Sequence, residues 1–321
     1  MVQYLIRRIL WAIVLFVAIT MVAYIIFFII PANPAQLACG QRASPACIRN
    51  ASRNLGLDRP VYEQYGRFLR RLVVHRDLGT SYINRQSVNE TVMNAAPVTA
   101  SLVLGGAVLW MLIALPVGIL SALRPRSLLD RTSMVFVLIG ISAHPVWIGL
   151  ILAYVVGFRL GWTPITGYCD FFNPATDCGG PTQWAYHLIL PWITYAVLFA
   201  ALYVRMIRAN VMEASGEDYV RTARAKGAPE YVVIRSHILR NALLPVVTLL
   251  GMDIGVALGG AIFTETVFAL PGLGQTALAA VTNFDLPTVQ GVVVFATIAI
   301  IVFNLVVDLL YVVIDPRIRL S

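Results

Sequence analysis

Long apolar runs, separated by polar and arginine-bearing segments, dominate this chain. Each run is long enough to cross the roughly 30 Å core of a bilayer at about 1.5 Å per helical residue. Inside a bilayer the backbone must satisfy its own hydrogen bonds, which favours helices. The pattern therefore predicts an all-α polytopic membrane protein with six transmembrane helices, at about 9–30, 97–123, 132–157, 187–207, 243–264 and 289–313.

The polar stretches divide the chain into three predicted parts. These are 1–30, the N-terminal cytoplasmic end and first span; 31–94, an extracytoplasmic insert; and 95–321, a five-span core with a cytoplasmic loop at 208–240. After Pro60, which suits the first turn of a helix, apolar residues recur at helical spacing. This amphipathic helix is expected to lie on the membrane or to pack on the protein body, as a solvated surface or a docking surface. Its apolar positions are Val61, Tyr65, Phe68, Leu69 and Leu72.

Composition supports a membrane protein. Hydrophobic residues make up 59% of the 321 residues and charged residues 12%, against about 45–50% and about 25% in soluble domains. An intrinsically disordered chain is also excluded, because disorder requires low hydrophobicity and high charge. Lys226, the only lysine, is followed by Gly227, and a P-loop needs Gly-Lys-Ser/Thr. The chain therefore has no nucleotide site of that kind, and without a basic, aromatic-interleaved soluble module no nucleic-acid binding is expected.

The placement of arginine predicts the orientation. Cytoplasmic loops carry an excess of basic residues, and the short outer loops 158–186 and 265–288 hold only Arg159. The insert 31–94 also holds arginines, but long translocated segments follow the rule weakly. Both termini are therefore predicted to be cytoplasmic, and the net charge of +8 is expected to set topology and to contact anionic lipid. The cytoplasmic basic segments are 1–8, 124–131, 205–240 and 315–321.

All four cysteines lie in segments assigned to the outside: Cys39, Cys47, Cys169 and Cys178. Because disulfides belong to oxidising compartments, these positions favour disulfides. Of the possible pairings, the local one, Cys39–Cys47 and Cys169–Cys178, closes two small loops; free thiols are the alternative. No metal site is expected, because His75 and His187 have no ligand-like spacing to either pair.

The cytoplasmic loop at 213–245 predicts two short helices with a break between them. Glu217 and Asp218 begin the first helix, where acidic side chains favour the positive helix end. Gly227 is placed to end it, because glycine adopts the left-handed conformation readily. Pro229 then begins the second helix.

The first of these helices has a face that suits a protein partner. Ala223 and Gly227 are four residues apart, with Tyr219 one turn before them. Small side chains permit close approach of another surface, and a tyrosine can anchor in a pocket. The helix is therefore expected to insert into a partner's groove; a surface helix at the lipid boundary is the alternative.

The run 219–227, followed by His237, 239–243 and Pro245, resembles the cytoplasmic EAA-type loop of ABC importer permeases. It is most similar to the version in the oligopeptide/dipeptide permease family, and the resemblance covers nearly the whole chain. The long first outer loop is similar to that of the first of the family's two permease subunits. Two features depart from the pattern: Arg221 stands where the generic motif has an acidic residue, and the cysteine pairs are not a family feature. Other matching pieces are 55–60, 77–79, 271–274 after Glu265, and 315–318.

The resemblance implies a type I ABC importer permease fold whose six helices form half of a translocation pathway, with a homologous second permease as the other half. It implies two cytosolic ABC ATPase subunits that hold ATP and Mg, and an extracytoplasmic peptide-binding protein. This chain is then a non-catalytic subunit without a cofactor, in the plasma membrane of a prokaryote. The segment 217–227 is implied to be the coupling helix that seats in the ATPase, through Tyr219, Val220, Arg221, Thr222, Ala223, Arg224, Ala225, Lys226 and Gly227.

Met252 and Asp253 lie well inside the predicted fifth span. An ionisable residue there costs at least about 2.5–3.5 kcal/mol, so Asp253 is expected to face the bundle interior, a partner or a water-filled path. It is either a pathway residue that meets a peptide's amino terminus or a structural hydrogen-bond partner. Gly255, Gly259 and Gly260 permit close helix packing, and an interface with the second permease is their expected use.

Three alternatives to a peptide importer stay open from the sequence. ABC permeases of this type also handle nickel complexes, glutathione or sugars. A self-sufficient secondary transporter usually carries several intramembrane ionisable residues or inverted repeats, whereas deep charge here is nearly confined to Asp253. A membrane scaffold or receptor without transport is the third.

Overall fold

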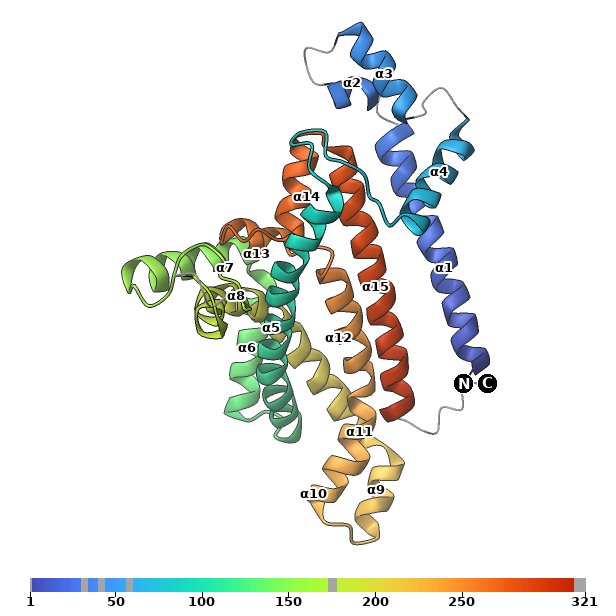
Figure 1. Ribbon diagram of the computed structural model, residues 1–321. Coiled ribbons are helices and arrows are strands. Elements are labelled where there is room, and N and C mark those ends of the chain that lie inside the picture. Colours follow the sequence, from blue (N-terminus) through green and yellow to red (C-terminus); the bar gives the residue numbers. More distant parts are fainter. Residues whose placement is uncertain (1, 30–33, 40–43, 56–59, 173–177, 315–321) are drawn as a thin grey trace.

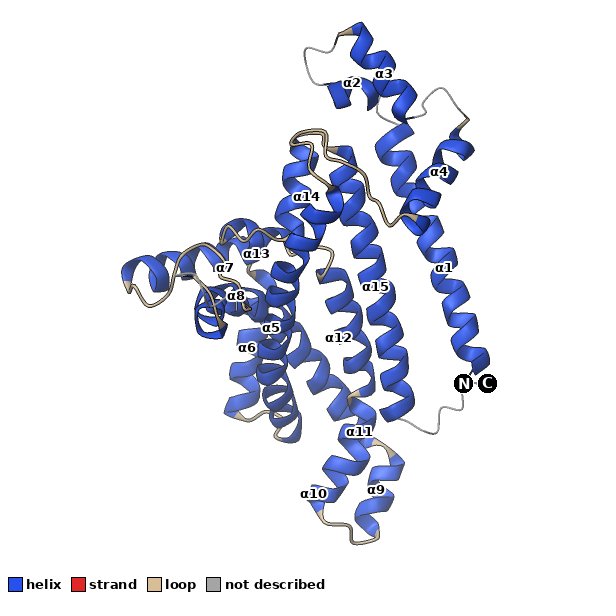
Figure 2. Ribbon diagram, viewed as in Figure 1, coloured by secondary structure: helices blue, strands red, loops and turns tan. Residues whose placement is uncertain are grey.

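A computed structural model describes residues 2–29, 34–39, 44–55, 60–172 and 178–314. These residues form helices joined by turns and loops (Figures 1 and 2), and their only strand-like pairings are the isolated bridges Thr80–Ser87 and Asp170–Gly179. The all-α prediction is confirmed for this part of the chain. The helices are α1 (Val2–Tyr24), η1 (Ile25–Ile29), α2 (Pro34–Cys39), α3 (Pro45–Leu55), α4 (Val61–Val74), α5 (Val88–Leu123), α6 (Leu128–Ser142), α7 (Pro145–Leu152), η2 (Ala153–Arg159), α8 (Pro181–Gly216), α9 (Asp218–Ala225), α10 (Glu230–Val232), η3 (Val233–Ile238), α11 (Leu239–Ala242), α12 (Leu244–Ala257), α13 (Ile262–Val267), α14 (Leu273–Thr282) and α15 (Leu286–Ile314).

Four helices of the described residues are individually long and apolar enough to cross a membrane: Ile6–Phe27, α5, α8 and Leu286–Val307. Two bent pairs pass the same test when each pair is taken together. The first joins α6 to α7 and η2 through a bend of 103°, and the second joins α10–α11 to α12 through a bend of 44°. The fold is that of a multi-pass membrane protein with four such helices, or up to six if each bent pair is one span.

The apolar run at 132–157 is not one straight helix, because the chain turns sharply before Pro145. Proline has no N–H to donate and disfavours the helical conformation in the residue before it. His144 accordingly has an extended backbone (φ −72°, ψ 137°), and its ring accepts a hydrogen bond from the Val146 backbone N–H at 3.3 Å. His144 therefore ends one helix and caps the next.

The centre of the bundle is the packing of α5 against α8. Trp110 of α5 is fully buried and stacks on Phe199 of α8, with ring centroids 4.7 Å apart. Tyr203, one turn further along α8, lies 5.9 Å from the same indole. A Cβ added to Gly118 of α5 would lie only 2.9 Å from a side chain of α8. Glycine at this position therefore permits the close approach of the two helices.

The glycines of α12 and the turn after it pack inside this chain. A Cβ on Gly255 would lie 3.2 Å from the Cα of Ile300, and one on Gly259 would lie 2.9 Å from Ala296; both partners belong to α15. Gly260 has φ +133° and lies against the backbone of Gly274. The expectation that these glycines serve an interface with a second permease is wrong, because α14 and α15 already cover them.

The predicted amphipathic helix of the insert is α4, and it packs on the protein body. Figure 1 shows α4 beside α1, at the edge of the bundle. The Tyr65 hydroxyl donates to the Val17 carbonyl at 2.9 Å and lies 2.9 Å from the Thr20 hydroxyl. Phe68 is buried in a cluster with Tyr24. The apolar face of α4 therefore holds the first membrane helix.

Both predicted disulfides are present, Cys39–Cys47 and Cys169–Cys178, with Cα–Cα distances of 6.1 and 5.0 Å. The second has a neighbour that sequence spacing does not indicate, since the Nδ1 of His187 lies 3.2 Å from the Sγ of Cys169. His187 therefore lies beside this disulfide in space, although its sequence spacing gave no ligand-like pattern. Because the two sulfur atoms are bonded to each other, they are not thiolate ligands in this state.

A polar clamp joins α5, α6 and α8 near one end of the bundle. Arg208 of α8 donates to both carboxylate oxygens of Asp130 on α6, at 2.6 and 3.0 Å. The Ser121 hydroxyl of α5 and the Arg126 backbone N–H donate to the same carboxylate, at 2.5 and 2.9 Å. Asp130 is only 5% exposed, and four N–H or O–H groups of the protein replace the water molecules that would otherwise bind its carboxylate.

We expect Asp130→Ala to lower the melting temperature of the detergent-solubilised protein by about 5 °C or more, because Arg208 keeps its charge in a mostly buried site without a partner. Asp218→Ala is the control, since Asp218 pairs with Arg221 at 3.5 Å on an open surface and such pairs contribute little. Differential scanning fluorimetry of both variants makes the comparison. An unchanged melting temperature in Asp130→Ala would contradict the clamp.

Candidate functional site

The predicted pair of short helices in the loop at 213–245 is confirmed as α9 and α10. The helix α8 ends at Gly216, Glu217 is extended (φ −69°, ψ 148°), and α9 begins with Asp218. Gly227 has φ +80°, the left-handed conformation that ends helices. Pro229 precedes α10 with ψ 142°. Figure 1 shows α9 and α10 at one end of the protein, beyond α11.

The inner face of α9 is buried within this chain. Val220 is fully buried and Ala223 is 8% exposed, in the same apolar cluster as Val233 and Ile238 of η3. Ala223 is therefore not the open small-residue surface that the sequence suggested, although Gly227 at the helix end is exposed. This burial fixes the helix on the segment that follows it.

The outward face of α9 has a different character. Its exposed side chains lie at positions i, i+3 and i+7, so they follow one line along the helix. Asp218 and Arg221 have side chains 96% and 73% exposed, and Ala225 is also exposed. We call this line of Asp218, Arg221 and Ala225 the outer ridge.

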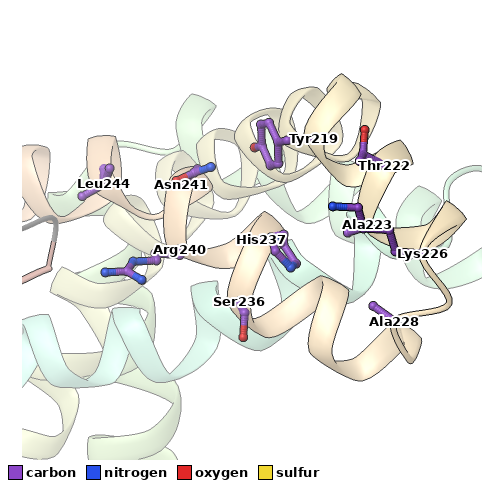
Figure 3. A pocket seen from close by; sticks show the side chains of 10 residues that line it. All are labelled: Tyr219, Thr222, Ala223, Lys226, Ala228, Ser236, His237, Arg240, Asn241 and Leu244. Carbon is purple, nitrogen blue, oxygen red and sulfur yellow. The ribbon is translucent and has the colours of Figure 1, made fainter. Parts of the chain in front are cut away.

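A third face of α9 lines a groove. Tyr219, Thr222, Ala223 and Lys226 form one helical stripe that faces η3 and α11 across a cavity of about 780 Å³. Figure 3 shows these side chains and those opposite around the opening. The remaining lining residues are Ala228, Ser236, His237, Arg240, Asn241 and Leu244. We call this cavity the α9 groove.

Two contacts hold the walls of the α9 groove in place. Arg224 donates to both carboxylate oxygens of Glu230, at 3.1 and 2.7 Å, and so ties the end of α9 to α10. Hydrogen bonding to Glu230 raises the pKa of the Arg224 guanidinium above its ordinary value. The Asn210 side chain of α8 donates to the Ala242 carbonyl of α11 at 3.3 Å. The loop is therefore anchored to α8, whose last turn leads into α9.

The two predicted pathway residues lie midway along α12. Asp253 is half-buried, and its Oδ2 accepts a hydrogen bond of 2.6 Å from the Tyr203 hydroxyl of α8. Met252 is 47% exposed, and Leu249 and Val256 on the same helical line are also exposed. One side of α12 is thus uncovered by the described residues, and Asp253 stands at its border.

From the sequence, Glu265 was noted only as the residue ahead of the motif piece 271–274, whereas it is fully buried in α13. Its Oε1 accepts hydrogen bonds from the Thr99 hydroxyl at 2.7 Å and the Ala261 N–H at 3.3 Å, and its Oε2 accepts one from the Gln275 N–H at 2.9 Å. The Thr99 hydroxyl also accepts from the Leu273 N–H at 2.8 Å. The proximity of Glu265 to the Pro-Gly-Leu-Gly run at 271–274 was the available signal.

Of the predicted coupling residues 219–227, the structure brings Tyr219, Thr222, Ala223 and Lys226 to one groove, and it leaves the other predicted site residues apart from it. Met252 and Asp253 belong to the middle of α12, and the cysteines lie in two separate pairs. Of the other motif pieces, 77–79 and 271–274 lie within the described chain. Residues 56–59 and 315–318 lie outside it.

The described residues form a helical membrane body with a short helix, α9, presented beyond it. Residues 114–320 match the family described as binding-protein-dependent transport system inner membrane component, and residues 1–103 match its N-terminal part. The chain belongs to this family, and the expected ABC importer permease is confirmed. It is a non-catalytic, multi-pass component of the plasma membrane.

Curated relatives match along nearly their whole length. The dipeptide transport system permease protein DppB of Alkalihalophilus pseudofirmus is 36% identical, over 99% of this chain and 100% of the relative. DppB of Escherichia coli K12 is 37% identical, over 99% of both. The probable D,D-dipeptide transport system permease protein DdpB of the same strain is 38% identical, over 98% of this chain and 97% of the relative.

We expect Thr99→Val to destabilise the protein by about 1–3 kcal/mol, because it removes a donor to the buried Glu265 carboxyl and leaves the Leu273 N–H without its acceptor. Thr282→Val is the matched control, since the exposed Thr282 hydroxyl bonds only to carbonyls of its own helix. Chemical denaturation in detergent measures both changes. Equal stability of the two variants would show that the network around Glu265 does not hold α13 and α14 to α5.

Proposed function

We propose that this chain is the membrane permease of an ATP-driven peptide importer. It forms half of the translocation pathway, a homologous second permease forms the other half, and two cytosolic ATPase subunits bind ATP and Mg. A peptide-binding protein outside the membrane delivers the substrate. The setting is a prokaryotic plasma membrane, with six spans and both termini in the cytoplasm.

The outer ridge of α9 carries this proposal. The described chain covers Val220 and Ala223 but leaves Asp218, Arg221 and Ala225 open. A rigid, exposed helix face at the end of a membrane protein suits insertion into a groove of a partner. The relatives named as dipeptide permeases support peptides as the substrate class.

The placement of the helix ends supports the cytoplasmic orientation. In Figure 1 the start of α1 and the end of α15 point toward the same end of the protein as α9 and α10. Basic residues lie at the start of α1 and in the loop 205–240, whereas the short loops 158–186 and 265–288 hold only Arg159, as the charge rule requires for short loops. The coupling loop and both termini are therefore proposed to face the ATPase subunits.

The open side of α12 is proposed to line the pathway or its border with the second permease. Leu249, Met252 and Val256 give it an apolar surface, and Asp253 adds a carboxyl group at its edge. A peptide's amino terminus is cationic, so this group suits its passage. Nickel complexes, glutathione and sugars are the alternative substrates, and the ligand of the co-purified binding protein distinguishes them.

We expect Ala225→Glu to leave membrane insertion intact and to lower uptake of a labelled dipeptide by about tenfold, equivalent to about 1.4 kcal/mol of coupling. Ala225 is chosen because it is exposed on the outer ridge, whereas a charge at the buried Ala223 would disturb packing within this chain. Tyr231→Ala, on the neighbouring α10, is the control. Full uptake by Ala225→Glu in cells that contain the whole transporter would contradict the coupling role of the ridge.

Two variants separate the possible roles of Asp253. Asp253→Asn removes the charge but keeps an oxygen that accepts from Tyr203, whereas Tyr203→Phe removes the hydrogen bond and keeps the carboxyl group. A pathway role predicts that Asp253→Asn raises the KM for dipeptide uptake several-fold, with assembly unchanged. A purely structural role predicts normal uptake by Asp253→Asn and loss only in Tyr203→Phe, and that result would remove Asp253 from the pathway.

A further inference from the structure

The α9 groove is a cationic cavity that the coupling helix alone does not explain. Its stripe from α9 ends at Lys226, and the opposite wall contributes His237, Arg240 and Asn241. The Ser236 hydroxyl also lies at the groove, whereas the Thr222 hydroxyl already donates to the Asp218 carbonyl at 2.8 Å. None of its lining residues is acidic. The cavity therefore presents hydrogen-bond donors and positive charge, and it favours an anionic, hydrogen-bond-accepting occupant.

Lys226 brings a full positive charge to a groove whose lining residues include no carboxylate. The nearest carboxylate along the loop belongs to Glu230, and it already accepts hydrogen bonds from the Nε and Nη2 groups of Arg224. Asp218, at the other end of α9, pairs with Arg221 on the outer ridge. Among the residues that the structure describes, Lys226 has no ion-pair partner. Because Lys226 is exposed to water, its ammonium group is solvated and needs no ion-pair partner in this chain alone.

A partner seated on α9 changes the surroundings of Lys226. The groove and the outer ridge are two faces of one eight-residue helix, so a protein that grips the ridge also covers the groove mouth. Burial of an unpaired ammonium group is unfavourable unless a counter-charge accompanies it. A stable complex therefore needs an acceptor that enters the groove together with the partner.

We propose that the α9 groove receives an acidic segment of the cytosolic ATPase subunit, with a carboxylate placed against Lys226 and His237. The inference rests on the proposed function, and it makes the contact reciprocal: α9 enters the ATPase, and an acidic loop of the ATPase enters this chain. Lys226 and His237 are then specificity residues for the partner. The outer ridge provides the surface that fits into the ATPase by shape. The groove provides the positive charge that selects one ATPase over another.

Cross-linking in the intact transporter tests this proposal. Ser236→Cys places a thiol at the groove, and Tyr231→Cys places one on the exposed surface of α10 outside it. The described residues include no free cysteine, so a photoactivatable maleimide labels the new thiol of this chain. We expect Ser236→Cys to cross-link to an Asp- or Glu-bearing segment of the ATPase, at least about fivefold more than Tyr231→Cys, because only the label in the groove lies within reach of a segment that occupies it.

Charge reversal provides the second arm. We expect Lys226→Glu to weaken retention of the ATPase by about tenfold in a pull-down of the complete transporter, and Lys226→Arg to retain it. Reversal of the cross-linked ATPase carboxylate to lysine is expected to restore binding to Lys226→Glu. Such rescue requires direct pairing, and a merely structural effect of Lys226→Glu would not produce it.

Arg221→Cys on the outer ridge separates this inference from the proposed function. Cross-linking of the ATPase through Arg221→Cys but not through Ser236→Cys would overturn the groove proposal and leave the coupling helix intact. Cross-linking of Ser236→Cys to the second permease or only within this chain would overturn it equally. An absence of ATPase at both positions in a transporter that retains uptake would overturn the proposed function itself.

Discussion

Close packing of α5 against α8 holds the rest of this protein in place. Lipid is as apolar as the helix surfaces, so membrane helices associate through close contact and buried hydrogen bonds. Trp110 supplies the contact at the centre, and Asp130 with Arg208 closes one end. At the other end the Trp192 indole of α8 donates to the Ser101 carbonyl of α5 at 2.9 Å. The helix α8 is thus held at three points along its length, all of them before its C-terminal end, which leads into α9.

This arrangement connects α9 to the membrane-spanning body through one element. The helix α8 has 36 residues, or about 54 Å of continuous helix. Its last turn leads into α9, and its middle carries Tyr203, which holds Asp253 of α12. A force applied to α9 therefore reaches the open side of α12 through a packed helix. A flexible linker at this place would absorb the motion instead of transmitting it.

Local signals in the sequence predicted local structure well. Contacts between segments that are far apart in the chain could not be predicted from the sequence. Gly227 and Pro229 predicted the break between α9 and α10 because one residue type determines each backbone conformation. Nothing in the sequence indicates which face of α12 packs on α15. The packing of Gly255 on α15 was therefore mistaken for an interface with a partner. The link between Asp130 and Arg208 spans 78 positions, and no spacing rule reaches that far.

The rigidity of α9 follows from contacts and not from its own helical preference. An isolated helix of eight residues is marginal in water, because nucleation costs more than so few hydrogen bonds return. Burial of Val220, the tie between Arg224 and Glu230, and the left-handed Gly227 hold it before any partner arrives. A partner that binds α9 therefore spends little binding energy on ordering it. More of that energy remains available to move α8, which is what the proposed coupling between an ATPase and the pathway requires.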